Sequence, residues 1–421
     1  MNDPRKAYGG VSRRRFLGMS AGAGALLVPG VSALLAACGK SSTEVTSTGV
    51  PTGGPSNPVE LPIFADNQAI ASGLSPEAGP LKVYAWPDFF APATFKAFEQ
   101  QYGVKIELLN FGTYDEAVRK LASGEVAIDV YLPPQEQLGK IVAAKLLQPL
   151  NNSYIPNRSN LWPELADPWY DKGARYTVAN TITNTGIGWR TDMISIDPAD
   201  FENPWDMLWD PSAKGKVGFY DQFREAMAMA FYRNGGMDPN TSSQDEIDKA
   251  KDALVELVAD NDARIGNDVA YLGIPEGKYA IAHAFSGDMT CAQFFLPKGQ
   301  SPSVLRYVWP RAFTDGRVGG HIGTDNFAVV RGARNPVLAH LFINHAVSTE
   351  QALEFWKWMA YQTPQKSMTA DWLIAKGLLP ENLQSTLVRP EDLAGAAWLQ
   401  TLEPALERRY LDAWMEVQRG A

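Results

Sequence analysis

Short apolar runs alternate with amphipathic stretches along the chain from residue 81 onward. They predict strands at LKVYAW, VKIELLN and IDVYLP, and helices at PATFKAFEQQYG, TYDEAVRKLASG and QEQLGKIVAAKLL. Pro92 and Gly103 stand at the start and the stop of the first helix. Thr113 and Glu116 have capping-box spacing at the start of the second helix. This β-α-β-α-β-α order predicts parallel strands joined by helical crossovers.

The alternation continues more loosely through the rest of the chain. Further strands are predicted at TGIGWR, KGKVGFYD, KYAIAHAF and VLRYVWP, and further helices at REAMAMAFYRNGG and QDEIDKAKDALVELVADN. From residue 335 onward the pattern is mostly helical. A chain of 421 residues is too long for one ordinary core. The sequence therefore predicts an α/β protein with two lobes.

Composition narrows the function classes. Hydrophobic residues make up 45% and charged residues 20%, which is typical of a soluble globular protein. The formal net charge of −9 argues against nucleic acid as a partner and is compatible with cationic ligands. Cys38 and Cys291 allow at most one disulfide, so a disulfide-stapled fold is not expected.

The N-terminal segment has the pattern of an export signal. A basic cluster precedes an apolar run from Phe16 to Ala37, long enough for a transmembrane helix but interrupted by glycines and Pro29. The basic start and the small residues before Cys38 fit a signal peptide over residues 1–37 better. SRRRFL resembles a twin-arginine signal with Arg13 and Arg14 as the pair, which is a translocase address.

The LAAC stretch that ends at Cys38 resembles a bacterial lipobox, in which the cysteine thiol receives a diacylglyceryl group. Two or more acyl chains hold a protein at a membrane. The residues that follow, GKSSTEVTSTGVPTGGPSNP, are rich in Ser, Thr, Gly and Pro, so residues 38–80 are predicted to be a lipidated cysteine and a flexible linker. The folded part is expected to begin near Leu81.

Catalytic and metal-binding patterns are scarce. The chain holds no G-x-G-x-x-G, phosphate-binding loop or C-x-x-C, and FSGD at residues 285–288 is not a nucleophile elbow. His340 and His345 are five residues apart on a predicted helix, which does not place them on one face. We therefore expect no catalytic residue, no metal, no cofactor and no enzymatic activity.

Several segments in order resemble one family. The chain from Leu81 to about Gln418 is similar to bacterial extracellular solute-binding proteins of the spermidine/putrescine type, which serve ABC importers. The resemblance rests on five segments: VYAWPDFFAPATFKAFEQQYGVKI, LASGEVAIDVYLPP, NPWDMLWDPSAKGKVGFYDQFREAM, GTDNFAVVRGARNPVLAHLFINHAVS and YQTPQ.

This resemblance implies a type II periplasmic-binding-protein fold, in which two discontinuous α/β lobes enclose a ligand cleft. Lobe one is expected at 81–185 plus 318–361, and lobe two at 186–317 plus 362–421. The implied partners are a small cationic amine of the spermidine/putrescine type and an ABC permease in the cytoplasmic membrane. The protein is expected to act as a monomer, exported and lipid-anchored on the outer face of that membrane.

The resemblance also implies the ligand-binding residues. Trp86 and Phe89 would be ring walls for an alkyl chain or an ammonium group. Asp325 from lobe one, with Asp221 and Glu225 from lobe two, would hold the amines through charge-assisted hydrogen bonds. Further contacts are expected from Gln135, Gln222, Phe285 and Gln400.

Each of these residues also has a structural alternative. Trp86 and Phe89 fit a place in the lobe core, and Asp325 follows Gly323 and Thr324 as a turn residue would. Acids such as Asp221 and Glu225 also favour helix N-termini, and both roles are compatible with ligand binding.

The sequence departs from the family where the family uses tryptophan. Gly323 and Phe285 stand at two such positions, Gln222 stands where a carboxylate is expected, and Pro133, Pro134 and Gln135 lack the family's serine. Another amine or a zwitterionic solute is therefore an alternative ligand. An exported enzyme on the same scaffold and a surface lipoprotein without a ligand are the alternatives from other classes.

Overall fold

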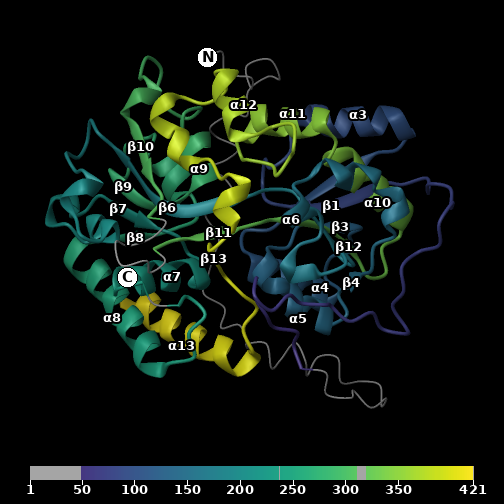
Figure 1. Ribbon diagram of the computed structural model, residues 1–421, viewed down its shortest axis with the longest axis horizontal. Helices are drawn as coiled ribbons and strands as arrows, with labels where there is room; N and C mark the ends of the chain where they lie inside the picture. Colours follow the sequence, from purple (N-terminus) through teal and green to yellow (C-terminus); the bar gives the residue numbers. More distant parts are fainter. Residues whose placement is uncertain (1–48, 237, 311–318, 421) are drawn as a thin grey trace.

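The computed structural model describes residues 49–236, 238–310 and 319–420. The export-signal and lipidation residues predicted from the sequence, Arg13, Arg14 and Cys38, lie outside the described residues. In the described part of the chain, no helix has the length and apolarity that a membrane span requires. Figure 1 shows two lobes side by side, with the strands of the first lobe on the right.

The first lobe is built on a six-stranded sheet in the order β2-β1-β3-β12-β4, with β5 also paired to β12. β1 is parallel to β2 and β3, as the helical crossovers predict, whereas β12 is antiparallel to its neighbours. The strands are β1 (Leu81–Ala85), β2 (Ile106–Asn110), β3 (Val130–Tyr131), β4 (Leu147–Gln148), β5 (Thr177–Ala179) and β12 (Asn326–Val330).

Local signals set the helices of this lobe, and the predicted capping box is confirmed on its N-cap side. The side chain of Thr113 accepts a hydrogen bond from the backbone N–H of Glu116, and Gly103 ends its helix with φ 68°. The third predicted helix is shorter than expected, because Lys145 adopts φ 55° before β4. The helices are α3 (Pro92–Tyr102), α4 (Tyr114–Ser123), α5 (Leu138–Ala143), α6 (Pro163–Ala166), α10 (Pro336–Ala346) and α11 (Thr349–Met359).

The second lobe is built on a seven-stranded sheet in the order β13-β11-β6-β9-β7-β8, with β10 also paired to β6. Its strands are β6 (Thr183–Arg190), β7 (Val217–Phe219), β8 (Arg264–Ile265), β9 (Ile281–Phe285), β10 (Leu305–Val308), β11 (His321–Gly323) and β13 (Ala397–Trp398). Its helices are α7 (Phe223–Arg233), α8 (Gln244–Asn261), α9 (Ser286–Ala292), α12 (Ala370–Ala375) and α13 (Pro404–Gly420).

The chain passes between the two sheets at three hydrogen-bonded crossings. Residues 180–182 lead from β5 into β6, Thr324 and Asp325 lead from β11 into β12, and residues 360–363 lead away from α11. The Thr181 N–H bonds to the carbonyl of Asp325 at 3.3 Å, and the Ile182 N–H bonds to the carbonyl of Gln362 at 2.8 Å.

These crossings move two predicted lobe boundaries. β11 lies in the second sheet, where Ile322 pairs with Asn184, so the return to lobe one comes at residues 324–325 instead of residue 318. β6 begins at Thr183, so residues 183–185 also belong to the second sheet. The pattern of apolar residues in the sequence did not reveal the pairing of β11 or the start of β6 at Thr183.

Residues 50–80 differ from the flexible linker that their composition predicts. They run along the first lobe, and the side chain of Leu61 is fully buried in its core. The N–H of Val59 bonds to the carbonyl of Trp169 at 2.6 Å, and the Glu77 carboxylate accepts from the N–H groups of Val337 and Leu338 at 3.0 Å. A few apolar anchors and backbone hydrogen bonds thus order a polar segment, which we call the N-terminal wrap.

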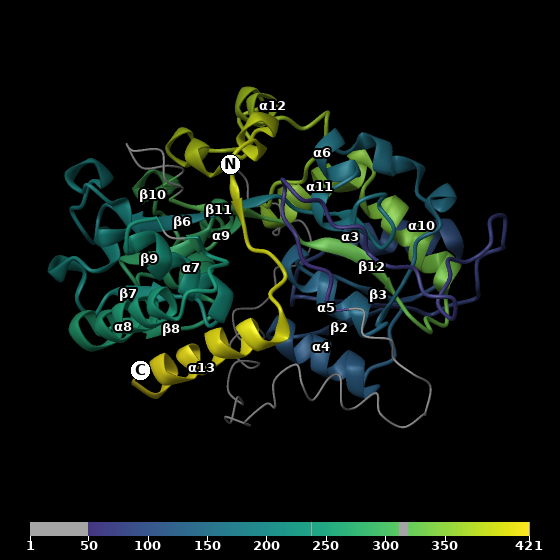
Figure 2. The ribbon, with the colours of Figure 1, turned by 60° about the horizontal axis from the view of Figure 1, so that its bottom comes forward.

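α13 connects the two lobes. It packs on α7 and α8 of the second lobe, while Glu407 in its first turn forms an ion pair with Lys140 on α5 of the first lobe. The Lys140 and Glu407 side chains are only 11% and 8% exposed. Figure 2 shows α13 running from beside α4 and α5 to the far side of the second lobe.

We predict that Leu61→Ala destabilises the protein by about 2–5 kcal/mol, because it removes a fully buried side chain and leaves a cavity. Leu74→Ala lies in the same wrap at a side chain that is 47% exposed, and should change stability by less than about 0.5 kcal/mol. Urea unfolding of the two variants checks this. Equal, small effects would show that the wrap is not part of the folded body.

Candidate functional site

The first cluster at the lobe junction joins Trp86, Tyr114 and Asp325. The indole N–H of Trp86 donates to the hydroxyl of Tyr114 at 3.2 Å, and that hydroxyl donates to the Asp325 carboxylate. The Trp86 ring centroid lies 5.0 Å from the Tyr114 ring and 4.7 Å from the Phe111 ring. The structure thus brings two of the predicted ligand residues, Trp86 and Asp325, to one place through a tyrosine that was not predicted.

The turn after β1 orients Trp86. Pro87 lacks a backbone N–H and ends the strand, and Asp88 takes φ 55°, a left-handed conformation that Asp tolerates better than most residues. The carbonyl of Asp88 accepts from the indole N–H of Trp358 on α11 at 2.7 Å. The turn is therefore tied to the helix that leads into the third crossing.

Asp325 lies on the second crossing, and its backbone is fixed on both sides. Its N–H donates to the hydroxyl oxygen of Thr181 at 3.1 Å, and its carbonyl accepts from the N–H of Asn180 at 2.9 Å. Burial raises the pKa of the Asp325 carboxyl to about 6, although the hydrogen bonds from Tyr114 and Thr181 oppose this rise. A nearby cation would favour its ionised form.

The second cluster surrounds Asp288, at the start of α9. Its carboxylate accepts from the hydroxyl of Tyr220 at 2.6 Å and from the hydroxyl of Tyr361 on the third crossing. Phe285 stacks on Tyr220 with ring centroids 4.4 Å apart and an interplanar angle of 19°. Burial raises the pKa of Asp288 to about 6 against these two hydrogen bonds. This cluster repeats the acid, tyrosine and flat ring of the first.

Backbone pairing places both clusters at the junction. Asp325 is itself a crossing residue, and the Asp288 partner Tyr361 precedes Gln362, whose carbonyl bonds to Ile182. The Asn184 N–H bonds to the hydroxyl of Ser286, at the start of the helix that carries Asp288. Two carboxyl groups therefore lie along one set of hydrogen-bonded crossings.

The sequence reasoning missed Asp288, Tyr114 and Tyr220. Asp288 ends the FSGD stretch, three residues after Phe285. Its position about one helical turn beyond a predicted ring residue is the sequence signal that could have indicated it. Tyr114 opens α4 behind its cap, where nothing in the local pattern indicates a ligand role. The short distance between Tyr114 and Asp325 is a tertiary contact across 211 residues.

Glu225 faces the interior of the second lobe. Its residue is 8% exposed, and its carboxylate lies 3.1 Å from His321 Nε2 and 3.8 Å from His283 Nε2. Burial acts to raise the pKa of Glu225, but His321 and His283 outweigh it and the pKa is lowered. Burial lowers the pKa of His283 to about 4. The Glu225 carboxylate therefore has partners within the protein, whereas the family resemblance implied that it would contact the ligand.

Asp221 and Gln222 lie before α7. One oxygen of Asp221 accepts from the side-chain N–H of Gln418 on α13 at 2.8 Å, and burial raises the pKa of Asp221. Gln222 is the N-cap of α7, without a side-chain capping hydrogen bond. Glu225 lies in the first turn of α7, as its alternative at a helix N-terminus expects, although the N-cap itself is Gln222 and neither Asp221 nor Glu225.

The remaining predicted residues pack within the protein. Phe89 is 3% exposed, with ring centroids 5.1 Å from Phe355 and 5.4 Å from Phe90, which favours its core alternative. The side-chain oxygen of Gln135 accepts from the Thr324 N–H at 2.8 Å. The Gln400 amide lies against the wrap, since a Cβ built on Gly54 would come within 2.6 Å of it.

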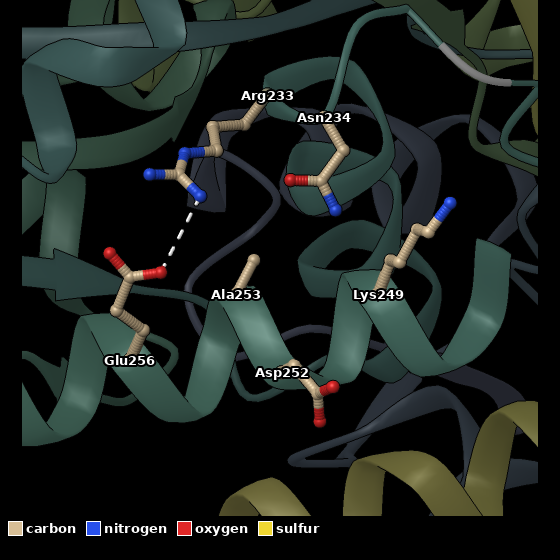
Figure 3. A pocket seen from close by; sticks show the side chains of 6 residues that line it. All are labelled: Arg233, Asn234, Lys249, Asp252, Ala253 and Glu256. Carbon is tan, nitrogen blue, oxygen red and sulfur yellow. Dashed lines mark ion pairs between the residues drawn. The ribbon is translucent and has the colours of Figure 1, made fainter. Parts of the chain in front are cut away.

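A surface hollow of about 420 Å³ lies elsewhere, between the end of α7 and one face of α8 (Figure 3). Its charges are balanced, with Arg233 paired to Asp206 at 3.1 Å and to Glu256 at 3.6 Å. The hollow is lined by Arg233, Asn234, Lys249, Asp252, Ala253 and Glu256, none of which was predicted to bind ligand. Across the described ranges no group of three or more His, Cys, Asp or Glu residues could hold a metal ion.

Two α/β lobes joined by three crossings define the two-lobe fold of type II periplasmic binding proteins. The chain belongs to the bacterial extracellular solute-binding protein family, whose model matches residues 93–381.

Individual relatives and solved structures are similar over most of the chain. A putrescine/cadaverine-binding protein of Pseudomonas aeruginosa is 28% identical over 291 residues, which cover 68% of this chain and 79% of that protein. The putrescine-binding periplasmic protein PotF of Escherichia coli is 25% identical, with 82% and 93% covered. The spermidine/putrescine substrate-binding protein PotD of Streptococcus pneumoniae superposes with a TM-score of 0.63 at 23% identity, covering 81% of this chain and 98% of that one.

We predict that Asp325→Asn stabilises the ligand-free protein increasingly as pH rises from about 4 to about 6, and by a constant amount above. The folded-state pKa is raised above the unfolded value of 3.8, so the wild-type protein loses folding stability in this window as the Asp325 carboxyl ionises. The gain at neutral pH is at most about 3 kcal/mol. Thermal unfolding at several pH values measures it. The exposed substitution Asp260→Asn is the control, and a pH-independent difference for Asp325→Asn would contradict the prediction.

Proposed function

We propose that this protein captures a linear polyamine at the lobe junction, as the substrate-binding component of an ABC importer. Family membership gives the role of solute binding. The names of relatives that bind putrescine, cadaverine and spermidine give the ligand class. The proposal is carried by one observation, the pair of carboxyl groups of Asp325, which is partly exposed, and Asp288, which is buried, each hydrogen-bonded by tyrosine and accompanied by a flat ring.

The chemistry of these clusters suits a chain with separated ammonium groups. A carboxyl with a pKa near 6 is mostly ionised at neutral pH, and the charge-assisted hydrogen bond that it forms with an ammonium group is about twice as strong as a neutral one. Trp86 and Phe285 offer ring faces to the cation and to the methylene groups. Gly323 supplies no ring where the family resemblance implies tryptophan, so Trp86 and Phe285 carry the aromatic part of the site.

A zwitterionic ligand is the second candidate, because solved relatives with this fold include one in complex with glucopine. Its carboxylate would require an available cation at the junction. Lys140 is paired with Glu407, and Arg224 donates to Asn240 at 2.6 Å and lies over the ring of Tyr410. The charges at the junction therefore favour an amine. An exported enzyme is less favoured, because the family is one of solute-binding proteins.

Lipid anchoring is the second part of the proposal. We infer that Arg13 and Arg14 direct export and that Cys38 is lipidated and attaches the protein to the outer face of the cytoplasmic membrane. Because the packed wrap begins at about residue 50, the tether from Cys38 reaches at most about 40 Å. Such a short tether keeps the lobes beside the permease that would receive the ligand.

We predict that calorimetry of the full chain detects putrescine, cadaverine or spermidine binding. Asp325→Asn and Asp288→Asn should weaken it by about 10- to 150-fold, because each removes a charge-assisted hydrogen bond. Trp86→Leu should weaken it by about 2- to 30-fold through loss of a cation–ring contact. Asp260→Asn should leave it unchanged. Binding of an opine or an amino acid, with no binding of any of the three amines, would contradict the proposed ligand class.

We predict that Cys38→Ser abolishes fatty-acid labelling in a bacterial host and releases the exported protein from the membrane fraction, because the thiol is the acylated atom. Cys291→Ser should keep both the label and the membrane association, since Cys291 is buried in the second lobe. Arg13→Lys together with Arg14→Lys should leave the precursor in the cytoplasm. Membrane retention of an unlabelled Cys38→Ser protein would instead support a transmembrane segment.

A further inference from the structure

A third carboxyl group lies near Asp325 at the junction. Glu136 stands two residues after Pro134, which forms an isolated β-bridge with Asp325. The N–H of Gln135 bonds to the carbonyl of Thr324 at 3.2 Å, and the N–H of Asn326 bonds to the carbonyl of Pro133 at 2.9 Å. The turn that carries Glu136 is therefore joined by backbone hydrogen bonds to the crossing that carries Asp325.

Charged and titratable groups surround Glu136 from both lobes. Asp325 approaches from the crossing, Tyr114 from α4 and Lys140 from α5, while Arg224 and Glu225 approach from α7 of the second lobe. Among these, Lys140 is paired with Glu407 and Glu225 with His321. Arg224 donates to Asn240 and forms no ion pair with Glu136 within the described part of the chain.

Glu136 itself is left without a cationic partner. Its carboxylate accepts a hydrogen bond from its own backbone N–H, and among the residues that the structure describes no other side chain forms a hydrogen bond with it. Burial, assisted by Glu225 and Asp325, raises its pKa to about 8, even though Arg224 acts in the opposite direction. The residue is nevertheless partly exposed, so a ligand at the junction can reach it.

The residue before the crossing has no side chain. A Cβ built on Gly323 would lie 3.6 Å from the Thr183 hydroxyl and 3.8 Å from the Gln135 side-chain oxygen, which is ordinary contact. Thr183 and Gln135 therefore lie beside position 323, and no side chain of residue 323 covers the turn that carries Glu136.

We propose that Glu136 is a specificity-determining residue that receives a third ammonium group, so that the site prefers a triamine to a diamine. This inference rests on the proposed function. It also implies that triamine binding releases a proton, because the neutral Glu136 carboxyl must ionise to pair with the ammonium group. Asp325 and Asp288, which titrate near pH 6, are already mostly ionised at neutral pH and release little.

The test is calorimetry of the full chain with spermidine and putrescine at about pH 7, in two buffers of different ionisation enthalpy. We expect close to one proton released per spermidine bound, and markedly less per putrescine. Glu136→Gln keeps the shape of the side chain and should abolish most of this release. Glu136→Gln should weaken the affinity for spermidine by about tenfold and the affinity for putrescine by less than about twofold.

A second measurement examines Glu136 without ligand. Because its folded-state pKa lies above the unfolded value of 4.5, ionisation costs stability as pH rises toward about 8. Glu136→Gln should therefore raise the Tm above that of the wild type at about pH 9, with a smaller difference at about pH 5. Glu164→Gln, at an exposed first-turn position of α6, is the matched control and should change neither the Tm difference nor proton release.

The outcomes separate this inference from the function on which it rests. The role of Glu136 would be overturned if Glu136→Gln weakened the affinities for spermidine and putrescine equally, or if it left proton release unchanged. Amine binding itself would then remain intact. The absence of a Tm difference at about pH 9 would remove its premise. If the wild type binds no amine, the proposed function fails and the role of Glu136 fails with it.

Discussion

Burial of acids without matching cations is the constraint on which the lobe junction depends. Asp325 and Asp288 are held with pKa values near 6 and Glu136 near 8, because low polarity disfavours their ionised forms. Of the nearby cations, Lys140 is paired with Glu407, whereas Arg224 donates to the neutral side chain of Asn240, and within the described residues two of its buried guanidinium nitrogens have no hydrogen-bond partner. The ligand-free protein therefore carries an electrostatic cost at the junction, and this cost is the physical basis of the proposed preference for a cationic ligand.

The same residues link ligand contact to lobe geometry. Asp325 lies on a crossing, and its carbonyl accepts from Asn180 and Thr181 on the neighbouring crossing. Asp288 bonds to Tyr361 on the third crossing, so both acids are attached to the strands that any change in lobe angle must bend. α13 adds a connection through Glu407 and Lys140, and the N-terminal wrap lies against Gly139 and Gln400 beside it. A change at the acids is thus transmitted to the junction through short covalent and hydrogen-bonded paths.

Sequence reasoning succeeded where the signal is local. Capping by Thr113, the stop at Gly103 and the strand stopped by Pro87 depend on neighbours along the chain, and the structure confirms these elements, with the strand one residue shorter than predicted. Whether a side chain faces the ligand or the core depends on tertiary packing, which alternation and spacing do not encode. The wrap shows the same limit, since Leu61 finds its pocket only in the folded first lobe, and a polar composition concealed it.

Glu225 and Asp288 show two different ways in which a buried acid is held near the junction. Both are buried in the second lobe, and both lie near the junction. Glu225 has His321 and His283 beside it, and its pKa is lowered, so its ionised form is already stabilised within the protein. Asp288 is held by two neutral tyrosine hydroxyls, which orient the carboxyl without neutralising it, and its pKa is raised. A cation arriving from solution gains most from the second kind of acid. Family resemblance alone favours Glu225, whereas the electrostatics of this chain favour Asp288 as the partner of Asp325.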